Sequence, residues 1–567
     1  MHKPANILYT VDEVPPLGVT LMSGLQQVGL ISVFLLFPLL VGREANLTDA
    51  QQINLLSISM VGLAVAAVLP ALRIGPVGAG YLAPAVFTAV YLGPSLLAAK
   101  VGGLPLVLGM TVFAGSVGIA LSAAMRRLRS FFPPEIAGLV VILIGIKTGT
   151  IGVRYMLGID TSGPSSLAEL AVPMGSLATM IGFSIWARGY PKLFCALIGM
   201  CVGYAIAALI GTLGGVEIGR ISASPLLGVP SIGQFGWAFD YSLAPAFTVA
   251  ALAACLRTVG NLTTCQKIND ADWVRPDMRQ IGNGVLADAL TTVSAGLLGT
   301  MGMNSSPSAI GLSTATGVTS RRVAYAIAAI FLALSLFPKA AATLTVMPRP
   351  VMGAMLVFAA SSVLVSGLEI INLRLLDSRR TYVIGLSLML GLAVDFFPGY
   401  FASLPERLHP LTDSSLALGM LSAIALNMLF RIGVRRTQRL IVDPEEVEAS
   451  NIERFMTSRG ATWGARRDVI ERATFNLEQS VETLASSGIA AGPLEIEVSF
   501  DEFTLDIRVS YEGLPLELAQ KRPSNEEIMA SEEGERKLAG FMLQRLADRV
   551  SVSQKGDRST IHFHFDH

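Results

Sequence analysis

Long apolar stretches, each about as long as a membrane-spanning helix, fill the first three quarters of the chain. A spanning helix needs roughly 20 apolar residues, and its backbone polar groups must be satisfied within the helix. The stretches that meet this description are 18–41, 53–72, 101–125, 134–153, 169–188, 191–213, 243–262, 281–302, 321–338, 340–367, 381–397 and 413–433. The pattern predicts an all-α polytopic membrane domain over residues 1–433.

Two further stretches, residues 78–98 and 303–319, are apolar but interrupted by Gly, Pro, Ser and Thr. We expect both to cross the membrane irregularly, which brings the predicted total to fourteen crossings. The broken crossings are then the third and the tenth, seven apart. This spacing is typical of two inverted repeats, here seven plus seven, whose interrupted helices meet near the membrane midplane.

The periodicity changes beyond residue 440. Residues 464–487 have the spacing of an amphipathic helix, whereas LEIEVSF (494–500) and TLDIRVSY (504–511) alternate as strands do. An acidic linker, a helix over 538–550 and a strand pair turned at the sequence KGD complete the pattern. These elements predict a soluble α+β sandwich domain over 450–567, joined to the membrane domain by a linker at 434–449.

Composition and charge divide the chain in the same way. The chain is 52% hydrophobic and only 15% charged, which excludes an ordinary water-soluble enzyme. Residues 1–433 carry 25 Lys+Arg and 18 Asp+Glu, a difference of +7, and residues 434–567 carry 17 and 24, a difference of −7. The four cysteines lack metal-ligand spacing and no nucleotide-binding or zinc-protease motif is present, so we expect no cofactor, no metal and no nucleic acid.

The orientation follows from the basic residues, which collect in the loops after the even-numbered crossings. Because such loops face the cytosol, both termini are expected there. The N-terminal residues MHKPANILYTVDEVPP have no charged-then-apolar leader pattern. We therefore expect an integral protein of a bacterial inner (plasma) membrane.

Several runs resemble the nucleobase/ascorbate transporter family, which includes uracil and xanthine permeases (nucleobase:cation symporter type 2). They are DEVPPLGVTLMSGLQQVG, GYLAPA, FPPEIAGLVVILIG, IGNGVLADALTTVSAGLLGT, SAIGLSTATGVTSR and FPKAAATLTVMPRPVMGAMLV, and they follow the family's order across residues 11–433. The resemblance implies a core of inverted repeats beside a gate bundle, usually as a homodimer. It also implies uptake of uracil, xanthine, urate or a related base with a proton or sodium ion.

The broken crossings define a candidate solute site. A half-helix N-terminus offers free N–H groups and a partial positive charge, and an unwound stretch offers carbonyls, so together they suit a planar, hydrogen-bonding solute. The residues expected to line it are Tyr81, Leu82, Ala83 and Val86 on one side and Ser308, Ala309 and Gly311 on the other. Gln26 and Gln27 of the first crossing either add amides to the site or bond helix to helix. Gln27 stands where many relatives have histidine.

The sequence departs from the family at two places where relatives bind the solute. Relatives carry a carboxylate in a motif like E-[SH]-[IV]-G-[DH] in crossing eight, where this chain has Arg257-Thr258-Val259-Gly260-Asn261. The Glu or Gln followed by Asn that is usual in crossing ten is Ser308-Ala309 here. Both side chains that hold an uncharged base in relatives have thus been exchanged.

Arg257 and Asp288 are the two charged residues within predicted crossings that bear most directly on the function. An arginine within a membrane segment costs about 2.5 kcal/mol or more unless it is paired or faces a wet cavity. Arg257 either attracts an anionic solute, for which guanidinium is well suited, or reaches the cytosolic end of its crossing a few residues away, or pairs with Asp288 of crossing nine. Asp288, in turn, is either the coupling residue that takes up a proton or a structural partner of the arginine.

The tail resembles the ATP-binding fold of histidine kinases and anti-sigma-factor kinases. The residues at its matching positions, Glu482, Tyr511 and a lid that retains only Gly540, lack the groups that hold magnesium and adenine, so we expect a regulatory or dimerising module without nucleotide. The leading hypothesis for the whole chain is secondary active transport of a nucleobase-like or small anionic solute. The alternatives are a receptor that signals through the tail and an anion carrier like the sulfate permeases.

Overall fold

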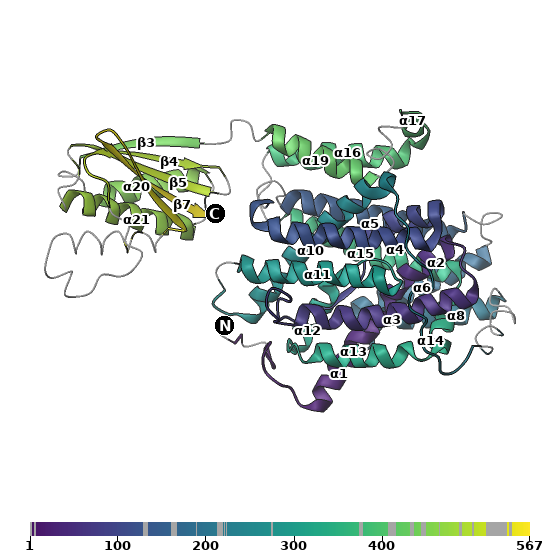
Figure 1. The fold of residues 1–567 in the computed structure, drawn as a ribbon. Helices are drawn as coiled ribbons and strands as arrows, with labels where there is room; N and C mark the ends of the chain where they lie inside the picture. The colour runs from purple at the N-terminus through teal and green to yellow at the C-terminus, as the bar shows by residue number, and fades with distance from the viewer. Residues whose placement is uncertain are drawn as a thin grey trace. The chain divides into compact units, whose positions relative to one another are not determined.

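The computed structural model divides the chain into two compact units, Met1–Asn427 and Met428–His567 (Figure 1). The residues that the structure describes are 3–4, 7–128, 134–159, 167–188, 190–211, 219, 222, 224–273, 276–372, 378–405, 415–430, 436–443, 449–463, 465, 467–486, 490, 492–501, 504–516, 541, 543 and 547–566.

The first unit is built almost entirely of helices. In chain order these are α1 (Leu17–Ser32), the 3-10 turn η1 (Val33–Leu35), α2 (Leu36–Glu44), α3 (Asp49–Ala71), α4 (Ala89–Leu128), α5 (Pro134–Leu157), α6 (Leu167–Trp186), α7 (Tyr190–Leu193), α8 (Cys195–Ile210), the 3-10 turn η2 (Tyr241–Leu243), α10 (Ala244–Asn269), α11 (Met278–Leu298), α12 (Pro307–Thr316), α13 (Val323–Ser335), α14 (Pro338–Thr345), α15 (Arg349–Ile371), α16 (Ser378–Phe396), α17 (Pro398–Ala402) and α19 (Ser415–Phe430).

Within the described residues, eight helical segments are long and apolar enough to cross a membrane, or nine if the bent pair α13–α14 counts as one span. Two more apolar helices, α8 and α19, have 16 residues each and fall below that length. The prediction of many spanning helices is therefore confirmed, and the total of fourteen stays a prediction.

Two helices depart from the boundaries expected from hydropathy. α4 contains both the second half of the third predicted crossing and the whole of the fourth, joined at a kink where Gly102 and Gly103 leave helical geometry. Gly103 has φ +68°, a conformation that side chains rarely adopt. The stretch 340–367, expected as one crossing, is instead divided between α14 and α15: Pro348 disfavours helix in the residue before it and caps α15, and Pro350 lies in the first turn of α15, where its missing N–H costs nothing. α14 also bends by 81° from α13.

The two broken crossings meet as a small antiparallel pair of strands, β1 (Ala85–Phe87) and β2 (Met303–Ser305). In this pair Ala85 lies opposite Ser305, Val86 opposite Asn304 and Phe87 opposite Met303. Each strand leads directly into a helix, β1 into α4 and β2 into α12. The interruptions therefore place two helix N-termini beside one another in the interior of the unit.

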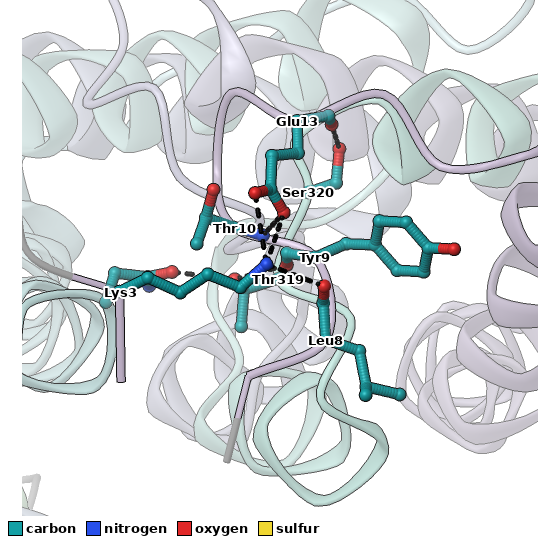
Figure 2. A network of polar contacts seen from close by, with 8 residues as sticks. Lys3, Leu8, Tyr9, Thr10, Glu13, Thr319 and Ser320 are labelled. Atoms are coloured by element: carbon teal, nitrogen blue, oxygen red, sulfur yellow. Dashed lines mark hydrogen bonds and ion pairs between the residues drawn. The ribbon is translucent and has the colours of Figure 1, made fainter. Parts of the chain in front are cut away.

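The N-terminal segment before α1 is bound to the end of α12 (Figure 2). The Leu8 and Tyr9 N–H groups donate to Gly317 O, and the Thr319 N–H donates to Tyr9 O (3.0 Å). Glu13 accepts from the Thr10 N–H (2.8 Å) and forms an ion pair with Lys3 (3.0 Å), as Figure 2 shows. The pKa of Glu13 is lowered, mainly because its carboxylate accepts a hydrogen bond from the Thr10 N–H and to a smaller extent because of the Lys3 ammonium. The start of the chain thus braces the C-terminal end of α12.

The second unit contains a five-stranded antiparallel sheet with two helices on one side (Figure 1). The strands are β3 (Arg436–Val442), β4 (Leu494–Phe500), β5 (Thr504–Glu512), β6 (Arg549–Lys555) and β7 (Arg558–Asp566), in the order β3-β4-β5-β7-β6. The helices are α20 (Ala449–Trp463) and α21 (Arg467–Ser486). Apolar side chains from the inner face of the sheet, such as Ile507 and Phe563, pack with Leu477 and Val481 of α21.

Part of the tail differs from its sequence-based prediction. Residues 436–442, expected as linker, form β3 and pair with β4 along their whole length. Most side chains of this edge strand are exposed, so it lacks the apolar alternation by which strands are identified. Helix α20 was not predicted, whereas α21, β4, β5 and the final strand pair lie close to their expected positions. The expected helix at 538–550 falls largely outside the described residues, although Arg549 and Val550 belong to β6.

Candidate functional site

Asp288 of α11 lies at the centre of a buried polar cluster beneath β2. Its side chain is 5% exposed. One carboxylate oxygen, Oδ2, accepts hydrogen bonds from the Thr258 hydroxyl, from Asn304 Nδ2 (2.6 Å) and from the Ser305 N–H (3.2 Å). Asn261 of α10 adds bonds to Ser305 O and Oγ, both at 2.9 Å. We call these five residues the Asp288 cluster; it ties α10, α11 and β2 together.

Arg257 lies beside this cluster but does not pair with Asp288. No ion pair within 4.0 Å joins these two described side chains; the guanidinium instead donates from Nη1 to Thr88 Oγ1 (3.0 Å). Thr88 also accepts from the Val90 N–H (3.3 Å), so it caps the start of α4. Of the alternatives left open for Arg257, the direct ion pair with Asp288 is thus absent between these two described side chains, although the guanidinium is close enough to act on the carboxylate electrostatically. Whether Asp288 has a coupling or a structural role stays a prediction.

The position of Arg257 along its helix also differs from expectation. α10 runs from Ala244 to Asn269, so Arg257 is thirteen residues from one end and twelve from the other (257 − 244 and 269 − 257). At 1.5 Å per residue, each end of the helix is roughly 18–20 Å away. A side chain at this depth is far from either end of the helix, and the half-buried guanidinium stays next to the broken crossings.

The Gln27 side chain forms helix-to-helix hydrogen bonds in this structure. It is 2% exposed, and its Nε2 donates to Ala309 O (2.8 Å) and to Ser313 Oγ (2.9 Å) of α12. Its carbonyl oxygen has no partner in the described residues. Gln26, one residue earlier, is half-buried. Gln27 therefore fixes α1 against α12, as its helix-to-helix alternative predicted.

The remaining predicted site residues separate into two groups. Val86 lies in β1, opposite Asn304, whereas Tyr81 points elsewhere: its hydroxyl donates to Gln280 Oε1 (3.1 Å) of α11 and its ring packs in an apolar cluster with Val11 and Ile281. Leu82 and Ala83 are buried. Ser308 and Gly311 of α12 are both exposed, unlike Ala309 between them. The structure thus places Val86 in the strand pair that leads into α12, two residues before the Thr88 that Arg257 contacts, and directs the Tyr81 hydroxyl toward α11 instead.

A cleft of about 210 Å³ begins at the N-terminus of α4. Its walls come from α4, α5, α10 and α19 and are mostly apolar, with Lys100, Lys147 and Thr148 as the polar exceptions. Lys147 donates to Ser415 Oγ (3.2 Å) and forms a 3.6 Å ion pair with Asp395. The cleft includes Ala89 and Val90, which directly follow the threonine that Arg257 contacts. An apolar cleft with a few polar groups is the usual form of a small-molecule site.

Sequence reasoning missed two residues of this region, Thr88 and Asn304. Asn304 is 2% exposed and donates to Asp288, to Thr258 Oγ1 (2.8 Å) and to Ala254 O (3.0 Å). The available signal was a single amide within the broken stretch GMNSS, since polar side chains inside membrane segments tend to be functional. Thr88 gave no signal, because a threonine is common in any helix start.

The tail residues expected to replace a nucleotide site are structural where they are described. The Tyr511 hydroxyl donates to Leu514 O (3.0 Å) and accepts from the Leu516 N–H (3.2 Å), and desolvation in this core raises the pKa of Tyr511. Glu482 lies on α21, where it accepts a bond from Gln479 (3.0 Å). Leu538, Ala539 and Gly540 lie outside the described residues.

The long apolar helices of the first unit indicate an integral membrane protein. The permease family model (Xan_ur_permease) matches residues 18–399. The chain therefore belongs to the xanthine/uracil permease family, which is a family of permeases and not of enzymes.

Named relatives agree with this assignment. The chain is 27% identical to the xanthine permease XanQ of Escherichia coli (strain K12) over 79% of this chain and 99% of the relative. It is 27% identical to the uric acid permease PucJ of Bacillus subtilis (strain 168) over 70% and 89%. Among solved structures, the transmembrane domain of the cyanobacterium bicarbonate transporter BicA aligns with a TM-score of 0.46 at 12% identity, covering 74% of this chain and 99% of that one.

Proposed function

We propose that this permease is a secondary active transporter of a nucleobase-like solute such as xanthine, urate or uracil, with a preference for the anionic form where the solute has one. The relatives named for xanthine and uric acid support the solute class. The observation that carries the proposal is the half-buried Arg257, held by Thr88 at the start of α4 beside an apolar cleft. Guanidinium at this place offers donors to a planar oxyanion.

The solute is proposed to lie between the two helix N-termini that follow β1 and β2. The exposed face of α12, with Ser308 and Gly311, would contact one edge of the solute, and Arg257 the other. Thr258 and Asn261, already bonded within the Asp288 cluster, would hold the geometry of this region rather than bind the solute directly. The polar groups of a small planar base would then replace water at both termini.

The remaining architecture is proposed from the same pattern. It comprises fourteen crossings as two inverted repeats, a homodimer in a bacterial inner membrane and both termini in the cytosol. Transport is coupled to a proton or a sodium ion, with Asp288 as the coupling residue, because a buried carboxylate between a fixed helix and a broken crossing can respond to both cation and solute. The tail is proposed as a regulatory or dimerising module.

Uptake into proteoliposomes tests the transport proposal. The full-length protein should accumulate radiolabelled xanthine or urate when an inward proton or sodium gradient is imposed. A receptor would bind the solute without accumulating it, and a passive carrier would only bring the two sides to equal concentration. Absence of both binding and uptake for purines and pyrimidines would exclude the proposed solute class.

Arg257→Gln tests the solute's charge. Loss of a hydrogen bond to a charged group is worth about 1.5–3 kcal/mol, so urate should bind roughly 10- to 100-fold more weakly at a pH where it is an anion. Binding of neutral uracil should change much less. Arg279→Gln, which removes an exposed arginine at the first turn of α11, serves as the control and should bind both solutes normally. Unchanged urate affinity in Arg257→Gln would make the arginine structural.

A further inference from the structure

The segment that precedes α1 runs alongside the residues that follow α12. We call residues 7–13 the N-terminal strap. Tyr9 forms a parallel bridge with Val318, and the Arg321 N–H donates to Val11 O (3.1 Å). The hydrogen bonds drawn in Figure 2 join the same two segments. Backbone groups just after α12 therefore hold the strap along most of its length.

One exposed carboxylate of the strap connects the flanks of both broken crossings. Asp12 accepts from Arg73 Nη1 (3.0 Å) and forms an ion pair with Arg321 Nη2 (3.1 Å). Arg73 lies between α3 and β1, and its side chain covers Gly80, where φ is +75° and a Cβ would clash with Arg73 Nε. Arg321 lies five residues beyond the end of α12 (321 − 316). Asp12 therefore joins the chain that leads into β1 to the chain that leaves α12.

A buried valine next to this carboxylate makes the same connection through apolar packing. Val11 is 2% exposed and belongs to a buried apolar cluster that includes Tyr81, from the stretch before β1, and Ile310 of α12. Exposed ion pairs contribute little, whereas apolar burial stabilises in proportion to the area removed from water. Val11 therefore supplies most of the strap's attachment, and the ion pairs of Asp12 define its register.

The helix starts that frame the proposed solute site need a support of this kind. β1 and β2 pair over only three residues each, and α12 has ten residues. A two-stranded pair is marginal by itself. The spacing between the start of α4 and the start of α12 thus depends on what holds the chain before β1 and after α12. The strap contacts both of these places.

We propose that the N-terminal strap positions the two helix starts for the solute, with Asp12 and Val11 as positioning residues that do not touch it. This step rests on the proposed function, which places the solute between these helix N-termini. A strap that holds the site in its binding geometry is itself held more tightly when solute is bound, because the coupling is reciprocal. Loosening the strap therefore weakens solute binding, and bound solute protects the strap.

Hydrogen exchange without solute tests whether the strap holds the strand pair. The full-length wild type is compared with Asp12→Asn and Val11→Ala in the peptides that contain β1 and β2. Loss of two exposed ion pairs should speed this exchange about threefold in Asp12→Asn, and loss of buried apolar area should speed it more in Val11→Ala. Asp272→Asn removes an exposed carboxylate between α10 and α11 and should exchange like the wild type. Unchanged exchange in both strap variants would overturn the proposal.

Solute affinity separates positioning from a general effect on stability, with xanthine and urate as the probes. Asp12→Asn should weaken their binding about threefold to tenfold and leave the unfolding midpoint without solute nearly unchanged. Asp12→Glu, which keeps the charge, should restore most of the affinity. Arg73→Gln should reproduce part of the loss, and the double variant with Asp12→Asn should bind no more weakly than Asp12→Asn alone, because both changes remove the same connection.

The reciprocal effect is measured in the wild type. Saturating xanthine or urate should slow the exchange of peptide 7–13 and leave that of β4 in the tail unchanged. Normal affinity in both Asp12→Asn and Val11→Ala, or an equal loss in Asp272→Asn, would overturn the positioning role. Failure of the wild type to bind or accumulate either base would contradict the proposed function instead. Faster solute-free exchange in the strap variants would then still support the strap as the holder of β1 and β2, and unchanged exchange would refute it.

Discussion

Polar groups are buried and enclosed in the Asp288 cluster, whereas on the outer face of the tail sheet they lie near water. In the cluster, one carboxylate is enclosed by Thr258, Asn304 and Ser305, and its Oδ2 atom has three specific donors, whereas Oδ1 has none among the described residues. On the outer face of the sheet, charges alternate along exposed strands: Glu497 contacts Arg439 (3.0 Å) and Arg508 (3.5 Å). Water can replace any of these outer contacts, whereas it cannot replace those of the cluster.

The difference shows which interactions determine how the elements of each unit pack together. Exposed ion pairs contribute little, about 0–1 kcal/mol each, so the tail depends on the apolar inner face of its sheet. The membrane unit has apolar side chains on nearly every surface, and these do not distinguish one helix partner from another in lipid. Its few buried polar bonds therefore define which elements meet, as Gln27 does for α1 and α12.

The largest effect is expected from an apolar deletion in the tail. Phe563 of β7 is 0% exposed in the inner-face core, and Phe563→Ala should destabilise the tail by about 3–5 kcal/mol. Hydrogen exchange of the β5 and β7 peptides in the full-length protein should report this loss of protection. Ser553→Ala, at an exposed position of β6, should leave exchange unchanged. Normal protection in Phe563→Ala would mean that the core does not hold these strands.

An intermediate effect is expected from the buried amide of the Asp288 cluster. Asn304→Ala removes a donor to a carboxylate, a loss worth about 1.5–3 kcal/mol. The matched change in the tail, Asn476→Ala, removes a buried amide that donates to a neutral carbonyl, Leu543 O (3.3 Å), and should cost about 1 kcal/mol. Solute binding should weaken only in Asn304→Ala. Equal effects on binding would remove the distinction between the two regions.

The smallest effect is expected from the charged outer face. Glu497→Gln breaks contacts to two exposed arginines, and the resulting change in the tail's stability should stay below about 0.5 kcal/mol. Exchange of the β4 peptide in the full-length protein measures it, and high salt should reduce even this difference by screening. A loss comparable to that of Phe563→Ala would show that the ion pairs, and not the inner core, stabilise the sheet.

Particular residues show what could be predicted. Hydropathy located the spanning helices because a membrane helix must carry a long apolar run, and the glycine- and proline-containing breaks located β1 and β2. The hydropathy pattern misassigned the boundary between α14 and α15, because a proline ends a helix within a few residues and leaves the average hydropathy unchanged. The pattern also missed β3, because the mostly exposed side chains of this strand do not alternate between apolar and polar. Arg257 and Asp288 were identified as exceptional charges, but the alternatives considered for them did not include Thr88 and Asn304, the side chains that they contact.

By itself, the sequence determined that the chain has an apolar membrane part and a charged tail, that two crossings are broken, and that a few charges lie where lipid would penalise them. These are properties of composition and periodicity, which act along the chain. Only the tertiary structure decided that Arg257 contacts Thr88 and that Asp288 bonds Asn304 and leaves one oxygen open. Such pairings join residues up to 169 positions apart, and they depend on side-chain directions that a one-dimensional pattern does not contain.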